Sequence, residues 1–125
     1  MIALVLPWPP SGNRYYRNVA GRTLIGREGR EYRQAVVRII RSCAVGSAAL
    51  PFRGRLRVTL LAAPPDRRRR DLDNLQKALL DACTHGGLWE DDSQIDDLRI
   101  VRGPIDRNNG AIAIQTEEIL EAIAA

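Results

Sequence analysis

The spacing of hydrophobic residues in the first half of the chain predicts two strands and one long helix. Residues 2–6 (IALVL) are continuously apolar and lie between polar or proline-rich neighbours, which predicts a buried strand. Residues 28–49 place apolar side chains three and four positions apart, the pattern of an amphipathic helix. Residues 55–63 begin with alternation and become apolar, so a second strand is expected there. Between them, residues 7–18 predict a rigid loop, and residues 19–26 predict either a short hairpin or irregular structure.

The second half predicts a further helix and two strands. Residues 71–84 carry their leucines on one helical face, and the Gly-Gly pair that follows ends the helix. Residues 95–103 and 111–118 alternate as two strands around a turn, and a short terminal helix is expected over 118–125. The order β-α-β-α-β-β indicates an α+β fold, a small mixed β-sheet with helices packed on one face.

Composition narrows the class of protein. The 125 residues fit one domain, 1–125, and their net charge of +4 favours an acidic partner, with nucleic acid first. No apolar run is long enough to span a membrane and the N-terminus has no secretory signal, so we expect a cytoplasmic protein. Two cysteines without ligand spacing predict reduced thiols, and a single histidine, His85, excludes a multi-histidine metal site. We expect no small-molecule cofactor.

The sequence RRRRDLDNLQK (67–77) places two aspartates directly after four arginines. The ordinary explanation is structural: Asp71 caps a helix, and Asp73 pairs with Lys77 one turn later. A second acidic group, Asp91-Asp92 with Asp96-Asp97, follows the helix and makes another explanation available. If a returning strand brings the two groups together, their carboxylates require cations, and hard oxygen ligands favour Mg²⁺ or Mn²⁺.

Such a site is suited to phosphodiester hydrolysis. One or two metal ions would activate water and stabilise charge on the scissile phosphate, with Lys77 as a nearby cationic point charge. Lys77 is the only lysine among 19 basic residues, so it stands out in a chain that otherwise uses arginine.

Two loops carry candidate contacts to nucleic acid. The first holds the arginines of residues 67–70, namely Arg67, Arg68, Arg69 and Arg70, which either bind phosphates or pair with neighbouring carboxylates. The second is GNRYYRN (12–18), where donors and tyrosines could contact phosphates and exposed bases: Asn13, Arg14, Tyr16 and Arg17. Core packing is the alternative for either tyrosine of this loop.

The residues quoted above resemble a known family. RRRRDLDNLQKALLDA followed by GLWEDDSQIDDLRI is similar to the RusA-type Holliday junction resolvases, and LPWPPSGNRYYRN resembles that family's opening motif. The resemblance covers nearly the whole chain. It implies a Mg²⁺-dependent endonuclease, with Mn²⁺ as a substitute, that works as a homodimer and cuts four-way DNA junctions by paired nicks. Many members of the family come from phages and prophages.

The resemblance also implies roles for individual residues. Asp71, Asp73 and Asp92 match the family's metal-binding catalytic carboxylates, and Lys77 matches its active-site lysine. The arginine loop matches the DNA-contacting region, with Arg70 nearest the site. The role of Asp91 stays open.

Two other hypotheses remain at this point. A non-catalytic nucleic-acid-binding module would use the arginines for phosphates and the aspartates for capping and ion pairs. A metal nuclease acting on flaps or other branched DNA would share the chemistry of a junction resolvase, and only a panel of substrates separates these two.

Overall fold

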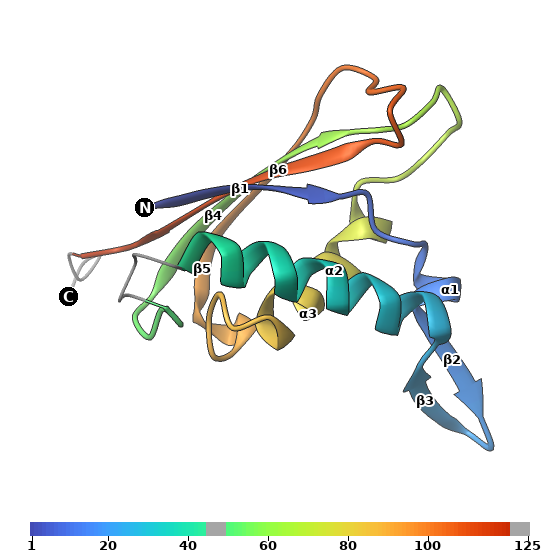
Figure 1. Cartoon of the computed structure of the whole chain (residues 1–125), viewed down its shortest axis with the longest axis horizontal. Coiled ribbons are helices and arrows are strands. Elements are labelled where there is room, and N and C mark those ends of the chain that lie inside the picture. The colour runs from blue at the N-terminus through green and yellow to red at the C-terminus, as the bar shows by residue number, and fades with distance from the viewer. Residues whose placement is uncertain (45–49, 121–125) are drawn as a thin grey trace.

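The computed structural model describes residues 1–44 and 50–120 (Figure 1). The order differs from the predicted β-α-β-α-β-β, because α1, β2, β3 and η1 are present in addition. The described elements are β1 (Ile2–Pro7), α1 (Gly12–Tyr15), β2 (Tyr16–Val19), β3 (Arg22–Ile25), α2 (Arg27–Ala44), β4 (Leu56–Ala63), α3 (Asp73–His85), the 3₁₀ helix η1 (Asp92–Gln94), β5 (Ile95–Arg102) and β6 (Ala111–Glu118). The prediction of a mixed α+β fold is confirmed.

The described strands β1, β4, β5 and β6 form one mixed sheet in the order β1-β6-β4-β5. β4 pairs with β5 in parallel, whereas β6 is antiparallel to both of its neighbours, β1 and β4. The turn between β5 and β6 therefore does not make a hairpin, although both strands were predicted. β4 lies between them, with Leu60 opposite Ile114 in its pairing with β6.

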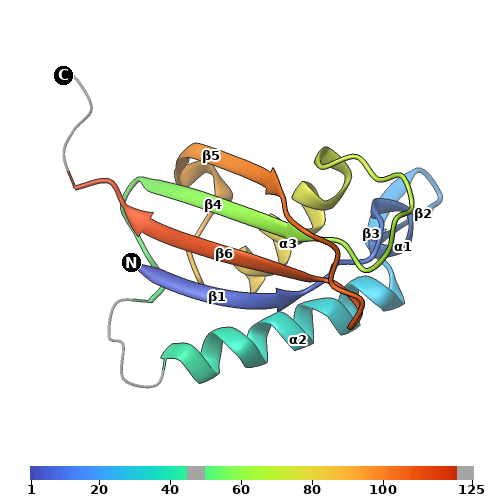
Figure 2. The same cartoon turned by 90° about the horizontal axis from the view of Figure 1, so that it is seen from above.

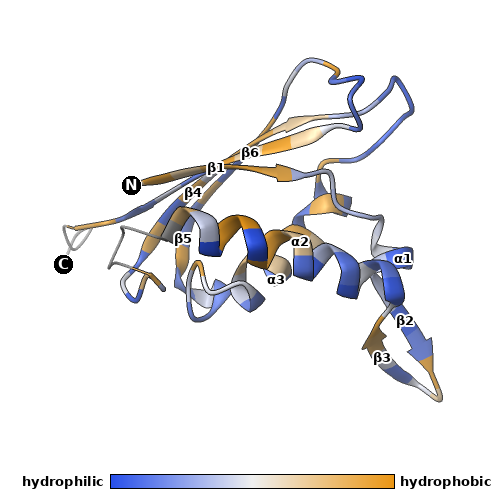
Figure 3. Ribbon diagram, viewed as in Figure 1, coloured by the Kyte–Doolittle hydropathy of each residue, from blue (hydrophilic) through white to orange (hydrophobic). Residues whose placement is uncertain are grey.

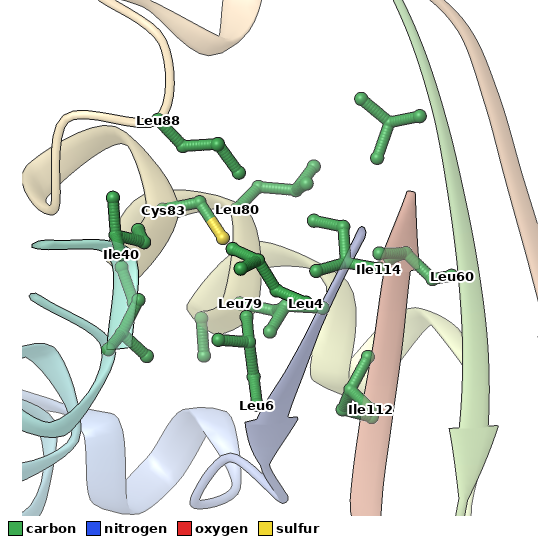
Figure 4. Close-up of a cluster of buried hydrophobic side chains, with 14 of the residues drawn as sticks. Leu4, Leu6, Ile40, Leu60, Leu79, Leu80, Cys83, Leu88, Ile112 and Ile114 are labelled. Atoms are coloured by element: carbon green, nitrogen blue, oxygen red, sulfur yellow. The ribbon is translucent and has the colours of Figure 1, made fainter. Parts of the chain in front are cut away.

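The core lies between one face of this sheet and the helices α2 and α3 (Figures 1 and 2). Residues on β1, β4 and β6 alternate between buried and exposed positions, because successive strand residues point to opposite faces. Figure 4 shows leucine and isoleucine side chains from the sheet meeting those of α3, with the Cys83 thiol among them. Cys83 is fully buried, and burial raises the pKa of its thiol to about 12.

The predicted boundaries differ from the structure at the irregular segments. The rigid loop predicted over 7–18 contains the short helix α1 and the start of β2. Residues 16–25 form a hairpin, one of the two alternatives for this region. Its turn at Ala20 and Gly21 has positive φ at both positions, as a tight hairpin turn requires.

The predicted long helix ends at Ala44, and residues 45–49 lie outside the described part. The predicted terminal helix is not present at Ile119 and Leu120, and its remainder, 121–125, also lies outside. Within residues 1–44 and 50–120, no helix is both long and apolar enough to cross a membrane.

Three loops lie together at the end of the sheet where β1, β4 and β5 finish. β1, β4 and β5 run in the same direction, so the segments that follow their carboxyl ends lie side by side: 8–15, 64–72 and 103–110 (Figure 2). Backbone bonds join two of them, since the Asp106 N–H donates to the Pro64 carbonyl at 2.8 Å. Both loops that were predicted to contact nucleic acid lie at this end of the sheet.

Candidate active site

Asp71 and Asp73 lie at the start of α3 with their carboxylates exposed and unengaged. The N-cap residue is Leu72, and no side chain caps the helix, so the prediction that Asp71 caps it is wrong. Asp71 contributes only its backbone carbonyl, which accepts a 3.2 Å bond from the Asn74 N–H. Neither carboxylate forms an ion pair within the described residues. Two neighbouring unpaired carboxylates at a helix N-terminus remain available to bind a cation.

Lys77 follows Asp73 by one helical turn but does not pair with it. Its Nζ atom instead lies 5.1 Å from the centroid of the Tyr16 ring, a cation–π arrangement. Tyr16 is half-buried, and burial raises the pKa of its hydroxyl, with the charge of Asp81 as a further cause. The expected Asp73–Lys77 ion pair is therefore not formed in the described structure. The exposed ammonium group is held against the Tyr16 ring instead.

Asp91 has a structural role that the sequence left open. It is the N-cap of η1, and its side chain accepts a 3.0 Å hydrogen bond from the Ser93 N–H. This bond lowers the pKa of its carboxyl. Asp91 thus shapes the short turn that carries the adjacent Asp92.

Gln94 fixes the same turn from the inside. Its buried amide accepts bonds from the N–H groups of Glu90 and Asp91, both at 2.9 Å, and donates to the carbonyls of Phe52 and Gly54. All of its bonding capacity is directed at backbone, which explains a glutamine in the sequence DDSQI. The sequence alone predicted no role for Gln94.

In the second acidic group of the sequence, Asp96 and Asp97 form ion pairs with arginines at the start of β4. Arg57 on β4 faces Asp97 on β5, and their side chains bond at 2.9 Å. Asp96 binds the guanidinium of Arg55 with both carboxylate oxygens. With Asp91 committed to its cap, Asp92 is the member of this group without an arginine partner among the described residues.

Asp92 lies on η1, which follows α3, and it interacts electrostatically with Asp81 on that helix. Burial raises the pKa of the Asp92 carboxyl, helped by a hydrogen bond with Asp91 and by the charge of Asp81. The charge of Asp92 in turn contributes to the raised pKa of Tyr16, whose ring contacts Lys77. The described residues contain no group of three Asp, Glu, His or Cys side chains able to hold a metal.

Arg70 is the most firmly held arginine of the 67–70 loop. It bonds the Asp66 carboxylate at 2.7 Å, and its guanidinium lies 5.7 Å from the centroid of the Trp8 ring. The Arg70 carbonyl accepts a 2.8 Å bond from Arg102. The bond from Arg70 and another from the Arg68 N–H lower the pKa of Asp66 to about 2. The alternative of pairing with neighbouring acids is thus confirmed for Arg70, and its partner is Asp66.

A pocket of about 630 Å³ opens between this loop and the loop after β1. The pocket is lined on one side by Trp8 and Arg14 and on the other by Arg69 and Asp71. Arg67 and Arg69 are exposed and form no ion pair within the described residues, whereas the exposed Arg68 reaches Asp66 only at 3.9 Å. Asn13, Arg14 and Arg17 are also exposed. The pocket near the N-terminus of α3 is thus lined by four of the predicted contact residues, and the other four do not line it: Arg14, Arg68, Arg69 and Arg70 as against Asn13, Tyr16, Arg17 and Arg67.

Three residues that the sequence reasoning missed tie this region together. Tyr15 is fully buried, and its hydroxyl donates a hydrogen bond to Asp81 on α3. Arg33 on α2 donates to the same Asp81 carboxylate at 2.6 Å and to the Tyr15 hydroxyl at 3.0 Å. Burial, followed by the bond to Asp81, raises the pKa of Tyr15. The i, i+4, i+8 spacing of Asp73, Lys77 and Asp81 was the available signal, because it places them on one side of a helix.

Arginines at the two ends of the sheet differ in their partners. At the end where β4 begins, Arg53, Arg55 and Arg57 all pair with acidic side chains. At the loop end, Arg14, Arg17, Arg22, Arg67 and Arg69 have no acidic partner among the described residues. Of these, Arg14 and Arg69 line the same pocket as Asp71.

The model of the family Endodeoxyribonuclease RusA matches residues 7–117 of this chain. The chain belongs to the RusA family. The match spans every residue assigned above to the candidate site, from Trp8 in the first loop to Asp92 before β5.

Relatives in this family include proteins of bacteria and of a phage. The chain is 50% identical over 104 residues to the crossover junction endodeoxyribonuclease RusA of Shigella sonnei (strain Ss046), covering 82% of this chain and 83% of the relative. It is 49% identical over 104 residues, with the same coverage, to the protein of that name from Escherichia coli (strain K12). For the protein of Enterobacteria phage 82 the identity is 50% over 103 residues, covering 82% of each chain.

Membership of the RusA family confirms the resemblance that the motifs indicated. The family is one of endodeoxyribonucleases, so this chain is an enzyme of that class and not a binding module alone. The ion pairs described above show which charged side chains of this chain have no ionic partner among the described residues.

Proposed function

We propose that this RusA-family chain resolves four-way DNA junctions by Mg²⁺-dependent hydrolysis of phosphodiester bonds. The observation that carries the proposal is that Asp71, Asp73 and Lys77 form no ion pair among the described residues. Side chains that served only to cap and stabilise α3 would engage the backbone or each other. Asp71 instead lines a pocket beside Arg14 and Arg69, Asp73 is exposed, and Lys77 contacts the Tyr16 ring. The names of the relatives, crossover junction endodeoxyribonuclease, support a junction as substrate.

The donor set at the start of α3 fits Mg²⁺. This ion prefers oxygen ligands and is commonly held by one or two carboxylates, with water and substrate phosphate completing its shell. Asp71 and Asp73 supply two exposed carboxylates two positions apart, directly after the arginines of residues 67–70. When bound, the ion would supply an activated water and charge neutralisation at the scissile phosphate. Mn²⁺ has the same ligand preference and is expected to substitute.

Asp92 is the third proposed ligand, and it lies on η1 instead of at the start of α3. It is exposed, has no arginine partner among the described residues, and interacts electrostatically with Asp81 and Tyr16. No group of three ligands is preformed among the described residues, so its participation depends on an arrangement formed when metal and DNA are bound. The raised pKa of its carboxyl is consistent with a group that gains from a nearby cation.

The roles of the remaining residues follow from their contacts. Lys77, held against Tyr16, provides a fixed positive charge for the phosphate undergoing attack. Arg67, Arg68, Arg69 and Arg14 contact flanking phosphates, while Arg70 keeps its loop in place through Asp66 and Trp8. Asn13, Tyr16 and Arg17 extend the DNA surface along the β2 side.

A homodimer is part of the proposal. Resolution of a junction requires two symmetric cuts, and a two-fold assembly presents two equivalent sites to a two-fold substrate. Each protomer would then supply one Asp71–Asp73 pair and one Lys77.

The deciding experiment is cleavage of a labelled synthetic four-way junction beside linear duplex and flap DNA, with Mg²⁺ or with EDTA. We expect paired nicks in the junction with Mg²⁺ and none with EDTA. Asp73→Asn should abolish nicking but leave junction binding intact or tighter, because it removes negative charge beside a phosphate. Asp97→Asn, which alters an exposed aspartate paired with Arg57, is the matched control and should cleave normally.

The outcomes separate the competing hypotheses. Normal cleavage by Asp73→Asn would refute the proposed metal site. Preferential cutting of flaps would identify a nuclease for other branched DNA. Asp92→Asn measured in parallel tests the third ligand: loss of nicking equal to that of Asp73→Asn assigns Asp92 to the active complex, and full activity removes it.

A further inference from the structure

The β2–β3 hairpin, residues 16–25, has two chemically different faces. Its register pairs Arg17 with Leu24 and Val19 with Arg22, and residues paired across an antiparallel ladder share a face. These four side chains therefore lie together on one side, here named the outer face. The inner face is made by the two intervening pairs, Tyr16 with Ile25 and Asn18 with Thr23.

The inner face attaches the hairpin firmly to the body of the protein. Tyr16 and Ile25 are half-buried and pack against the core. Beyond the strands, the Gly26 N–H donates to the Tyr15 carbonyl at 2.8 Å, closing the base of the hairpin. A side chain at Gly29 would lie 2.3 Å from that carbonyl, so α2 approaches the base as closely as glycine permits. The hairpin is thus mounted rigidly at its base.

The outer face has no contact that explains its composition. Val19 is 39% exposed and Leu24 is 42% exposed, and both arginines of this face are exposed. Arg17 and Arg22 form no ion pair within residues 1–44 and 50–120. Residues 12–27 include four arginines and no acidic residue. Figure 1 shows the hairpin projecting beyond the N-terminal end of α2, and Figure 3 shows polar and apolar positions close together along it.

This combination fits nucleic acid better than a protein surface. Unpaired guanidinium groups bind phosphates, and aliphatic side chains pack on base faces that have lost a stacking neighbour. An intact duplex exposes few such faces, whereas bases at a branch point expose them. Tyr16 belongs to the same strand as Arg17 and also contacts Lys77, so the hairpin begins at the proposed cleavage site.

We propose that the outer face of the β2–β3 hairpin is a branch-recognition surface, in which Arg17 and Arg22 bind phosphates while Val19 and Leu24 pack on unstacked bases. This inference rests on the proposed function and extends it to residues outside the cleavage site. It predicts that the two aliphatic side chains discriminate a junction from a linear duplex, and that the two arginines strengthen binding to both.

The test measures binding in EDTA, by fluorescence anisotropy, to a four-way junction and to a linear duplex of the same arm sequence. The double variant Val19→Thr/Leu24→Thr places β-branched threonines, which suit a strand, at both positions and should weaken junction binding about tenfold, leaving duplex binding unchanged. Arg22→Ala should weaken both and reduce the slope of log affinity against log salt by about 1. Arg38→Ala removes an exposed, unpaired charge from α2 and is the matched control, expected to change neither ratio nor slope by a comparable amount.

The two proposals fail in distinguishable ways. If the wild-type chain cleaves junctions but the threonine variant retains the wild-type ratio of junction to duplex affinity, the branch-recognition surface is refuted and the proposed function stands. Equal losses on both substrates would also refute it, since the aliphatic side chains would then have no role at the branch. If the wild-type chain neither binds nor cleaves junctions, both proposals fall. Unchanged thermal unfolding of the variants confirms that the fold is intact.

Discussion

The Nζ atom of Lys77 lies 5.1 Å from the centroid of the Tyr16 ring, which joins the centre of α3 to the first residue of β2. An ammonium group above an aromatic ring keeps its charge and loses much of its conformational freedom. The contact therefore holds a positive charge one helical turn after Asp73, and no ion pair joins it to Asp71 or Asp73 among the described residues. It also couples the proposed catalytic helix to the hairpin proposed to recognise the branch.

Lys77→Ala should separate cleavage from binding. Removing a preorganised charge from a site of developing negative charge typically lowers turnover about 10²- to 10³-fold, and we expect that loss in single-turnover cleavage of a four-way junction. Junction affinity, measured in EDTA, should change far less, because many arginines contribute to it. Equal losses in cleavage and affinity would show that Lys77 only docks the DNA.

Tyr16→Leu tests whether the ring positions that charge. Leucine retains apolar bulk but offers no π face, so Lys77 becomes free to move and cleavage should decrease. The expected loss is smaller than that of Lys77→Ala, since the charge is still present. The matched variant Tyr16→Phe keeps the ring and should retain most of the activity. If phenylalanine is as damaging as leucine, the tyrosine hydroxyl is what matters.

Asp81 should prove to be a structural carboxylate and not a metal ligand. It accepts bonds from Tyr15 and Arg33, which leaves it engaged where Asp73 is not. Asp81→Asn should lower the free energy of unfolding by about 1–2 kcal/mol, the range for a partly exposed charged hydrogen bond, as measured by urea denaturation. At a temperature where the variant is folded, its cleavage rate should stay near that of the wild type. A stable variant that cannot cleave would instead place Asp81 in the metal site.

Gly29→Ala should destabilise the protein although it lies within a helix. Alanine in a helix interior is normally favoured over glycine by about 1 kcal/mol. Here the added Cβ would approach the Tyr15 carbonyl oxygen to 2.3 Å, and backbone cannot move aside as a flexible side chain can. We expect a lower midpoint of thermal unfolding. Gly12→Ala is the control, because a Cβ there meets nothing within 4 Å, and its midpoint should be unchanged or slightly higher.

The Asp66–Arg70 contact predicts a specific titration. Arg70 lowers the pKa of Asp66 to about 2, so the ionised form is favoured in the folded protein. The stabilisation is fully present above the unfolded-state pKa of about 3.9 and is lost as the pH falls towards 2. Arg70→Ala should therefore raise the pKa of Asp66 towards its ordinary value, measured by NMR of the carboxyl carbon. A midpoint that stays near 2 in the variant would assign the shift to the Arg68 N–H instead.

Periodicity predicted the main elements because helix and strand patterns are local properties of the chain. The long helix began within a residue of its predicted position, and both C-terminal strands were found. Which strands pair is a long-range choice, and the turn between β5 and β6 misled the prediction, since β4 enters between them. Likewise, the sequence did not distinguish the two adjacent tyrosines. In the structure Tyr15 is buried, whereas Tyr16 is half-buried and its ring contacts Lys77.

The sequence by itself determined the family, the acid–lysine motif and the basic character of its surroundings, because these depend on residue type and spacing. Only the tertiary structure decided which charges are free. The parallel register of β4 and β5 sets Arg57 against Asp97 and so removes that acid from the candidate site. The same crossover carries the chain through α3 to η1, where Asp91 caps the turn while Asp92 has no arginine partner among the described residues. Charges that look equivalent along the chain become paired, structural or reactive according to what the fold places beside them.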